Sequence, residues 1–196
     1  MVKAVTSIPM WDKGWYRYAR QLPSPNFGDR PSGTAIDLLV IHSISLPPGE
    51  FCNGNVQKFF TNQLDCTAHP YFQTLLGVQV SAHFFISRDG ALWQFVSCDH
   101  RAWHAGQSSY LGRPDCNNYS IGIELEGLEG GLFDVPQYET LAALGTAVLS
   151  HYPVKNLAGH EHIAAGRKAD PGSRFDWHYL ERSLGVPKSW LPGSSE

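Results

Sequence analysis

The chain has 196 residues, 17% of them charged, and a net charge of −3 with histidine neutral. This length suits one domain over residues 1–196, and such a domain closes its hydrophobic core as a monomer without disulfides. The small net charge and the absence of any block of like charges exclude nucleic acid and an anionic membrane as expected partners.

The N-terminal residues contain no apolar run of the length that a signal peptide needs, and no later run approaches a membrane span. We therefore expect a cytoplasmic protein. Before about residue 37, prolines and glycines mix with scattered aromatic residues, which indicates an extended arm over the core rather than a helix. We expect the core at about residues 20–182, followed by a short C-terminal tail.

The first strand is expected at residues 37–43, a nearly continuous apolar run that ends at His42. This pattern is typical of a strand buried on both faces, with its carboxyl end opening on a cleft. Residues 80–87 and 91–96 indicate two strands joined by a tight turn at Asp89-Gly90, because glycine readily takes the positive φ angle of such turns. The fold class is therefore α/β, a central mixed β-sheet flanked by helices.

Later elements complete this sheet. Residues 120–126 alternate in type and carry β-branched side chains, which predicts another strand. Residues 136 to about 151 place apolar side chains at helical spacing behind a proline suited to a first turn, so we predict a helix there. Residues 55–64 and 175–184 are candidates for shorter helices.

Nine histidines and four cysteines are the first residues to consider for metal chemistry. The cysteines are Cys52, Cys66, Cys98 and Cys116. Their spacings contain no CxxC pair and the domain is large enough to fold without disulfides, so we expect reduced thiols rather than zinc ligands. A single histidine at a strand end is usually a hydrogen-bonded structural residue, so His42 alone does not establish a site.

Residues 159–172 concentrate two histidines, an aspartate, a lysine and three glycines without helical or strand periodicity, which indicates a loop. Imidazole nitrogens and one carboxylate oxygen form the ligand set of a catalytic zinc that keeps a fourth position for water. The third ligand must come from elsewhere, and His42 is the best-placed candidate. Lys168 either stabilises an oxyanion or is a solvated loop lysine.

Glu124 is the candidate proton acceptor for water at such a zinc, because it lies between apolar neighbours in the strand predicted at 120–126. In the alternative interpretation, Glu124 and Glu126 share the outer face of an edge strand, since they have the same parity. These residues alone indicate a zinc hydrolase of unknown substrate.

Seven separated segments carry a resemblance to a known family. They are residues 39–51, 69–72, 80–84, 101–106, 120–127, 159–160 and 166–172. Together and in this order they resemble the AmpD family of bacterial cytosolic 1,6-anhydro-N-acetylmuramyl-L-alanine amidases, within the superfamily of amidases and peptidoglycan recognition proteins. The resemblance covers about residues 20–182.

This resemblance implies a Zn²⁺ site, two catalytic residues and a small muropeptide as substrate. The zinc ligands of the family match His42, His160 and Asp170. Its catalytic residues match Glu124, rather than Glu126, and Lys168. The implied reaction is hydrolysis of the amide between (1,6-anhydro-)N-acetylmuramic acid and the L-alanine of the peptide stem, in cytosolic peptidoglycan recycling.

The chain departs from the family pattern at four positions. Ser43 stands where we expect asparagine, and Ala169 interrupts the usual Lys-Thr-Asp sequence, so both changes touch the zinc surroundings without removing a ligand. Gln79 and Asp115 stand where relatives often carry arginines suited to stem-peptide carboxylates, and Arg113 is close enough in sequence to substitute. These last changes bear on recognition of the stem more than on catalysis.

We expect Trp103, His104 and Ala105 to shape the cleft, and interpret His83 and His104 as structural histidines. Three alternative functions are a peptidoglycan-binding recognition module without activity, a broad-specificity amidase of the intact cell wall, and a zinc hydrolase of unrelated substrate, which would require all the motif matches to be coincidental. The complete set of candidate ligands and acid–base residues argues against the first. The absence of a signal peptide argues against the second.

Overall fold

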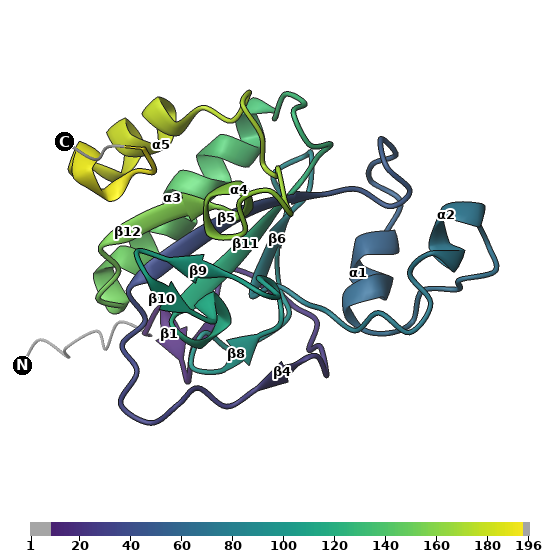
Figure 1. Cartoon of the computed structure of the whole chain (residues 1–196), viewed down its shortest axis with the longest axis horizontal. Helices are drawn as coiled ribbons and strands as arrows, with labels where there is room; N and C mark the ends of the chain where they lie inside the picture. Colours follow the sequence, from purple (N-terminus) through teal and green to yellow (C-terminus); the bar gives the residue numbers. More distant parts are fainter. Residues whose placement is uncertain (1–8, 194–196) are drawn as a thin grey trace, which may run out of the picture.

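The computed structural model describes residues 9–193 and is built around a six-stranded mixed sheet (Figure 1). The strand order is β12 (Asn156–Gly159), β5 (Leu38–Ile44), β11 (Ser120–Glu126), β6 (Phe84–Ile86), β7 (Leu92–Gln94) and β3 (Arg20–Gln21). The strands from β12 to β6 are parallel, β6 and β7 form an antiparallel hairpin, and β3 runs parallel to β7. The predicted mixed α/β sheet is confirmed.

The two faces of the central strands have different neighbours. The helix α3 (Val135–His151) covers one face, and α5 (Trp177–Leu184) packs on α3 (Figure 1). Odd-numbered residues of β5 and β11, such as Leu39 and Ile123, share one hydrophobic core with Leu141 of α3. Since successive strand residues face opposite sides, the even-numbered residues, His42 and Glu124 among them, belong to the other face.

Shorter elements surround this sheet. They are β1 (Trp11–Asp12), β2 (Trp15–Tyr16), β4 (Phe27–Gly28), β8 (Arg101–Ala102), β9 (Ser109–Tyr110), β10 (Arg113–Pro114), α1 (Asn55–Phe60), α2 (Pro70–Gln73), α4 (His160–Ile163), and 3-10 helices at Cys116–Asn118 and Lys188–Trp190. Figure 1 shows α1 and α2 beside the sheet rather than over α3. Phe59, Phe60 and Phe72 from these two helices pack with Phe85 of β6 in a separate apolar cluster.

Most of the predicted elements are confirmed. The strand at 37–43, the hairpin around Gly90, the strand at 120–126 and the helix from 136 match β5, β6–β7, β11 and α3. The two shorter helices are present as α1 and α5 but span fewer residues. None of the four cysteines forms a disulfide. No helix within residues 9–193 is long and apolar enough to cross a membrane.

Two interpretations were wrong. β11 is not an edge strand, because it lies between β5 and β6 and all seven of its residues are buried. The stretch 159–172 is not a loop throughout, because Gly159 ends β12 and residues 160–163 form α4. A helix of four residues is too short to show periodicity, although its Ile163 is buried against β5 and β12.

Short strands and no helix occupy residues 9–37, the arm ahead of β5. Arg30 ties this arm to Cys98 and to the residues that lead into β11. Its guanidinium donates five hydrogen bonds of 2.8–3.2 Å to the backbone carbonyls of Cys98, Asn117, Asn118 and Ser120. Burial lowers the pKa of Arg30 to about 10, so the side chain stays charged at neutral pH.

We expect Arg30→Met to lower the free energy of unfolding by about 3 kcal/mol or more, because each buried carbonyl left unpaired costs about 1–3 kcal/mol. Arg30→Lys should recover only part of this loss, since an ammonium group lacks the planar fork of donors. Urea unfolding followed by circular dichroism measures both. Arg113→Met is the control, because Arg113 is half exposed in its ion pair with Asp37 and should cost about 1 kcal/mol or less. Equal midpoints for Arg30→Met and wild type would contradict the role of Arg30.

Candidate active site

The candidate site lies beyond the carboxyl ends of β12, β5 and β11, the edge of a parallel sheet at which ligands usually bind. His42 of β5 pairs directly with Glu124 of β11, so the two side chains are neighbours on one face. Gly159 of β12 pairs with Ile41 of β5, and His160 follows Gly159 at the start of α4. The sheet register therefore brings together residues that lie up to 118 positions apart in the sequence.

His42, His160 and Asp170 form a compact group of potential metal ligands. His42 Nδ1 lies 3.0 Å from His160 Nδ1, and Asp170 Oδ2 lies 3.3 Å and 3.2 Å from these two nitrogens. Ligand atoms of a tetrahedral zinc, at bonds of about 2.0–2.2 Å, are about 3.3–3.5 Å apart, close to the observed triangle. Two imidazoles and one carboxylate thus fit zinc and leave a fourth coordination position open.

His42 and Asp170 have the protonation states that binding of a metal cation requires. Burial lowers the pKa of His42 to about 4, which keeps its imidazole neutral at neutral pH. Burial by itself raises the pKa of Asp170, but the neighbouring His160 and His42 imidazoles outweigh burial and hold this pKa well below its ordinary value. Neutral imidazole and ionised carboxylate are the forms that bind metals.

Glu124 lies beside this group but is not part of it. Its side chain is buried, and among the residues that the structure describes its Oε2 atom has no hydrogen-bond partner. Burial raises the pKa of Glu124 well above its usual value, the Asp170 charge raises it further, and the Lys168 charge opposes both. A buried carboxylate oxygen without a partner is costly, which favours a chemical role over a structural one.

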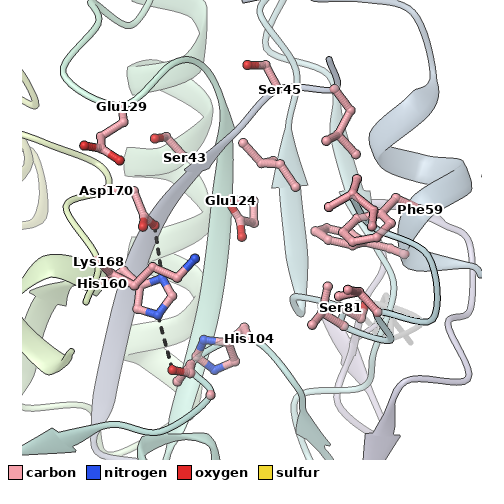
Figure 2. Close-up of a pocket in the computed structure, with 18 of the residues that line it drawn as sticks. Ser43, Ser45, Phe59, Ser81, His104, Glu124, Glu129, His160, Lys168 and Asp170 are labelled. Carbon is pink, nitrogen blue, oxygen red and sulfur yellow. Dashed lines mark hydrogen bonds and ion pairs between the residues drawn. The ribbon is translucent and has the colours of Figure 1, made fainter. Parts of the chain in front are cut away.

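Figure 2 shows Glu124, Lys168, Asp170 and His160 directed into one part of a cleft. The cleft has a volume of about 1160 Å³ and extends from these residues to an apolar wall formed by α1 and the segment after α2. Phe59 and Ser81 lie on this opposite side in Figure 2. The cleft therefore has a polar end suited to chemistry and an apolar end suited to binding.

Glu126 shows what a structural glutamate in the same strand looks like. Its Oε1 atom accepts the backbone N–H of Cys52 at 2.6 Å, and its Oε2 atom accepts the backbone N–H of Arg88 at 3.0 Å. Both oxygens are thus satisfied by loop backbone. Although Glu124 and Glu126 have the same parity, only Glu124 lines the cleft.

Other predicted residues have mixed outcomes. Trp103, His104 and Ala105 all line the cleft, as expected, and so do Ser43, Gln79 and Ala169. The Ser43 hydroxyl oxygen is buried and has no hydrogen-bond partner in the described part of the chain. Arg113 does not line the cleft but pairs with Asp37 at 2.6 Å and stacks on Tyr119. Arg113 therefore does not take over a cleft position.

His83 has the structural role that its sequence context predicts. Its Nδ1 atom accepts the backbone N–H of Gly122 at 3.0 Å, and its Nε2 atom lies 3.1 Å from the carbonyl oxygen of His100. Burial lowers the pKa of His83 well below its usual value, which keeps the ring neutral. Both ring nitrogens are used within the core, and His83 does not line the cleft.

Sequence reasoning missed Asn117 and Arg167. Asn117 Oδ1 accepts the backbone N–H groups of both His104 and Ala105, at 3.1 Å and 2.8 Å. The Arg167 guanidinium donates to the Ala105 carbonyl at 2.8 Å, and His160 Nε2 lies 3.2 Å from the same oxygen. These contacts join segments far apart in the chain, so no local pattern in the sequence indicates them.

Comparisons with known proteins point to one family. The N-acetylmuramoyl-L-alanine amidase family (Amidase_2) matches residues 32–173. The chain is 48% identical over 180 residues to the 1,6-anhydro-N-acetylmuramyl-L-alanine amidase AmpD of Citrobacter freundii, a match that covers 91% of this chain and 96% of that protein.

Comparison with solved structures points to the same family. A crystal structure of a selenomethionine AmpD derivative superposes with a TM-score of 0.86 at 47% identity, over 88% of this chain and 98% of that chain. Escherichia coli AmiD in complex with anhydro-N-acetylmuramic acid-L-Ala-D-γ-Glu-L-Lys superposes with a TM-score of 0.58 at 25% identity, over 82% of this chain and 66% of that chain. The chain therefore belongs to the N-acetylmuramoyl-L-alanine amidase family and matches its AmpD members over most of its length.

Proposed function

We propose that the chain is a zinc-dependent amidase of peptidoglycan recycling. Its substrate is a muropeptide, and the bond cut joins the lactyl group of 1,6-anhydro-N-acetylmuramic acid to L-alanine. The observation that carries the proposal is the triangle of His42 Nδ1, His160 Nδ1 and Asp170 Oδ2, with sides of 3.0–3.3 Å, at the end of a large cleft. Family membership narrows the chemistry that such a triangle performs to amide hydrolysis.

A zinc ion held by His42, His160 and Asp170 would supply a Lewis acid that lowers the pKa of a bound water and polarises the scissile carbonyl. Glu124 is the group that takes the proton from the attacking water. Its raised pKa makes it a stronger base than an exposed glutamate, and its side chain lines the cleft beside the proposed ligands.

Lys168 stabilises the negative charge that develops on the carbonyl oxygen, since its ammonium group points into the same end of the cleft (Figure 2). Water oxygen bonds to the lactyl carbon, the carbon–nitrogen bond breaks, and Glu124 passes its proton to the departing amine of L-alanine. Because water is the nucleophile, no serine or cysteine nucleophile is needed.

The buried Glu124 also favours an enzyme over a recognition module without activity. A module that only binds muropeptides gains nothing from an unpaired carboxylate beside three metal ligands, and the cost of burying such a group is substantial. An active site gains a base of raised pKa from the same arrangement.

The relatives support a small muropeptide as substrate. AmpD of Citrobacter freundii is named for the 1,6-anhydro sugar, and the AmiD complex holds an anhydro-muramyl peptide. The cleft of about 1160 Å³ is large enough for a ligand of this size. The cytoplasmic location and the monomeric state stay predictions.

Cleavage of two matched muropeptides tests the proposal, one ending in 1,6-anhydro-N-acetylmuramic acid and one with a reducing sugar, followed by mass spectrometry. We expect release of the intact peptide from the anhydro substrate, loss of cleavage after chelation, and recovery on adding zinc. Equal cleavage of both substrates would remove the anhydro specificity. Binding without cleavage would support the recognition module, and cleavage unaffected by chelation would contradict the zinc dependence.

A further inference from the structure

A chain of hydrogen bonds leads from the candidate metal site into the core. His42 Nε2 lies 2.9 Å from His104 Nδ1, and His104 Nε2 lies 3.1 Å from Ser120 Oγ. The Ser120 hydroxyl in turn lies 2.6 Å from the backbone carbonyl oxygen of Cys116. All of these residues are buried, so the polar groups find their partners within the protein.

The Cys116 carbonyl determines which group donates and which accepts in each of these three hydrogen bonds. A carbonyl oxygen only accepts, so the single hydroxyl proton of Ser120 points at Cys116. The Ser120 oxygen then accepts from His104, which places the proton of the neutral His104 ring on Nε2 and leaves Nδ1 as an acceptor. His104 Nδ1 accepts from His42 Nε2, so the lone pair of His42 Nδ1 faces His160 and Asp170.

We propose that His104 is a positioning residue for the metal site, because it holds His42 in the tautomer that turns its Nδ1 lone pair toward the cation. The proposal rests on the proposed zinc site. Asp170 favours the opposite tautomer of His42, because its carboxylate lies 3.3 Å from His42 Nδ1 and would stabilise a proton on that nitrogen. Such a proton competes with a metal ion, so the acceptor at His104 Nδ1 counters the attraction of Asp170.

The strand β11 provides the space for this ring. A Cβ atom added at Gly122 would lie 2.5 Å from His104 ring atoms, so a side chain at that position would displace the ring. Ser120, Gly122 and Glu124 share one face of β11. The strand thus presents in succession the acceptor for His104, the space for its ring and the proposed base.

The backbone beside His104 orients the second imidazole. The Ala105 carbonyl accepts from His160 Nε2 at 3.2 Å, which leaves the His160 Nδ1 lone pair facing the site. Asn117 Oδ1 holds the N–H groups of both His104 and Ala105. The dipeptide His104-Ala105, held by Asn117, therefore orients both proposed histidine ligands. The His104 side chain orients His42, and the Ala105 carbonyl orients His160.

The test compares zinc affinity in wild type, His104→Leu and His104→Asn, by competition with a chromophoric chelator. Leucine fills much of the ring volume but accepts no hydrogen bond, so the affinity should fall about 10- to 100-fold, the usual cost of losing an outer partner of a metal-binding histidine. Asparagine places a carbonyl oxygen near the position of the imidazole Nδ1 and should restore most of the affinity. Equal affinity in all three folded proteins would overturn the proposal.

Ser120→Ala serves as a second variant that leaves the His104 ring in place. Without the Ser120 oxygen, the His104 proton can move to Nδ1 and force the His42 proton onto the metal side, so zinc affinity should again fall. If His104→Leu does not fold, Ser120→Ala still tests whether His104 positions His42 for the metal ion. Unchanged zinc affinity in folded Ser120→Ala would contradict the proposed series of hydrogen bonds from Ser120 through His104 to His42.

Nitrogen-15 NMR of the imidazoles in zinc-free protein separates this proposal from the proposed function. We expect the His42 proton on Nε2 in wild type and a substantial fraction on Nδ1 in His104→Leu and Ser120→Ala. If wild type failed to bind zinc, the proposed function would fall, but the His42 tautomer would still test His104. An unchanged tautomer in the variants would overturn the role of His104 alone.

Discussion

Glu124→Gln is expected to abolish turnover while zinc stays bound. The amide has nearly the same shape as the carboxylate but cannot accept a proton from water, so kcat should fall by about 10²- to 10⁴-fold, the usual contribution of a general base. Zinc should remain, because the proposed ligands are His42, His160 and Asp170 and not Glu124. Replacing a buried carboxylate of raised pKa by a neutral amide also removes a desolvation cost, so the variant should be at least as stable as wild type.

Three measurements on the same preparation check this prediction: muropeptide turnover, zinc content per chain and the urea midpoint. Glu126→Gln is the matched control, since Glu126 lies on the same face of the same strand but accepts the backbone N–H groups of Cys52 and Arg88. We expect this control to retain turnover and to lose about 1–3 kcal/mol of stability. Near-normal turnover in Glu124→Gln would show that the proton acceptor is another group, and loss of zinc would assign Glu124 a role in the metal site.

The opposite effects expected for Glu124 and Glu126 show which of their properties can be predicted from the sequence alone. Equal parity places Glu124 and Glu126 on one face of a strand, and this part of the reasoning is confirmed. Whether that face is open to solvent depends on the strand order, which local patterns do not contain. The central position of β11 between β5 and β6 excludes the edge-strand interpretation.

The sequence predicts β5 as a nearly continuous apolar run, because that strand is buried on both faces, and it predicts β11 from the alternation of residue types and the β-branched side chains. β12 and α4 escape prediction because each has only four residues, too few for any period to appear. These two elements nevertheless place His160 beside His42, through the pairing of Gly159 with Ile41. Residue chemistry and the family resemblance indicate His160 as a ligand, although the sequence predicts no helix or strand that holds it.

The contacts around His104 are harder still to predict. Its three neighbours in the hydrogen-bond network, His42, Asn117 and Ser120, lie 62, 13 and 16 positions away in the sequence. Without the fold, His104 is simply another buried histidine, the same interpretation that is confirmed for His83. The two histidines differ in what they contact: His83 bonds only to core and arm groups, whereas His104 contacts a proposed zinc ligand.

Asp170→Ala is expected to remove zinc and, with it, all turnover. The variant leaves two neutral imidazoles and no anionic ligand, so zinc affinity should fall by more than the roughly 100-fold upper value for an outer partner such as His104. Zinc content after dialysis measures this loss. Glu129→Ala is the control, because it removes one negative charge from the same cleft without touching the triangle, and it should retain zinc. Stoichiometric zinc in dialysed Asp170→Ala would exclude Asp170 as a ligand.

Unfolding gives a second readout of Asp170→Ala that does not depend on activity. A ligand that binds only the folded state raises the free energy of unfolding by about 4 kcal/mol when its concentration is 1,000 times the dissociation constant. Wild type should therefore unfold at a higher urea concentration with zinc than after chelation, while Asp170→Ala should show one midpoint under both conditions. A zinc-dependent shift retained in Asp170→Ala but lost in a variant of His42 or His160 would place the ion on the imidazoles and require a different third ligand.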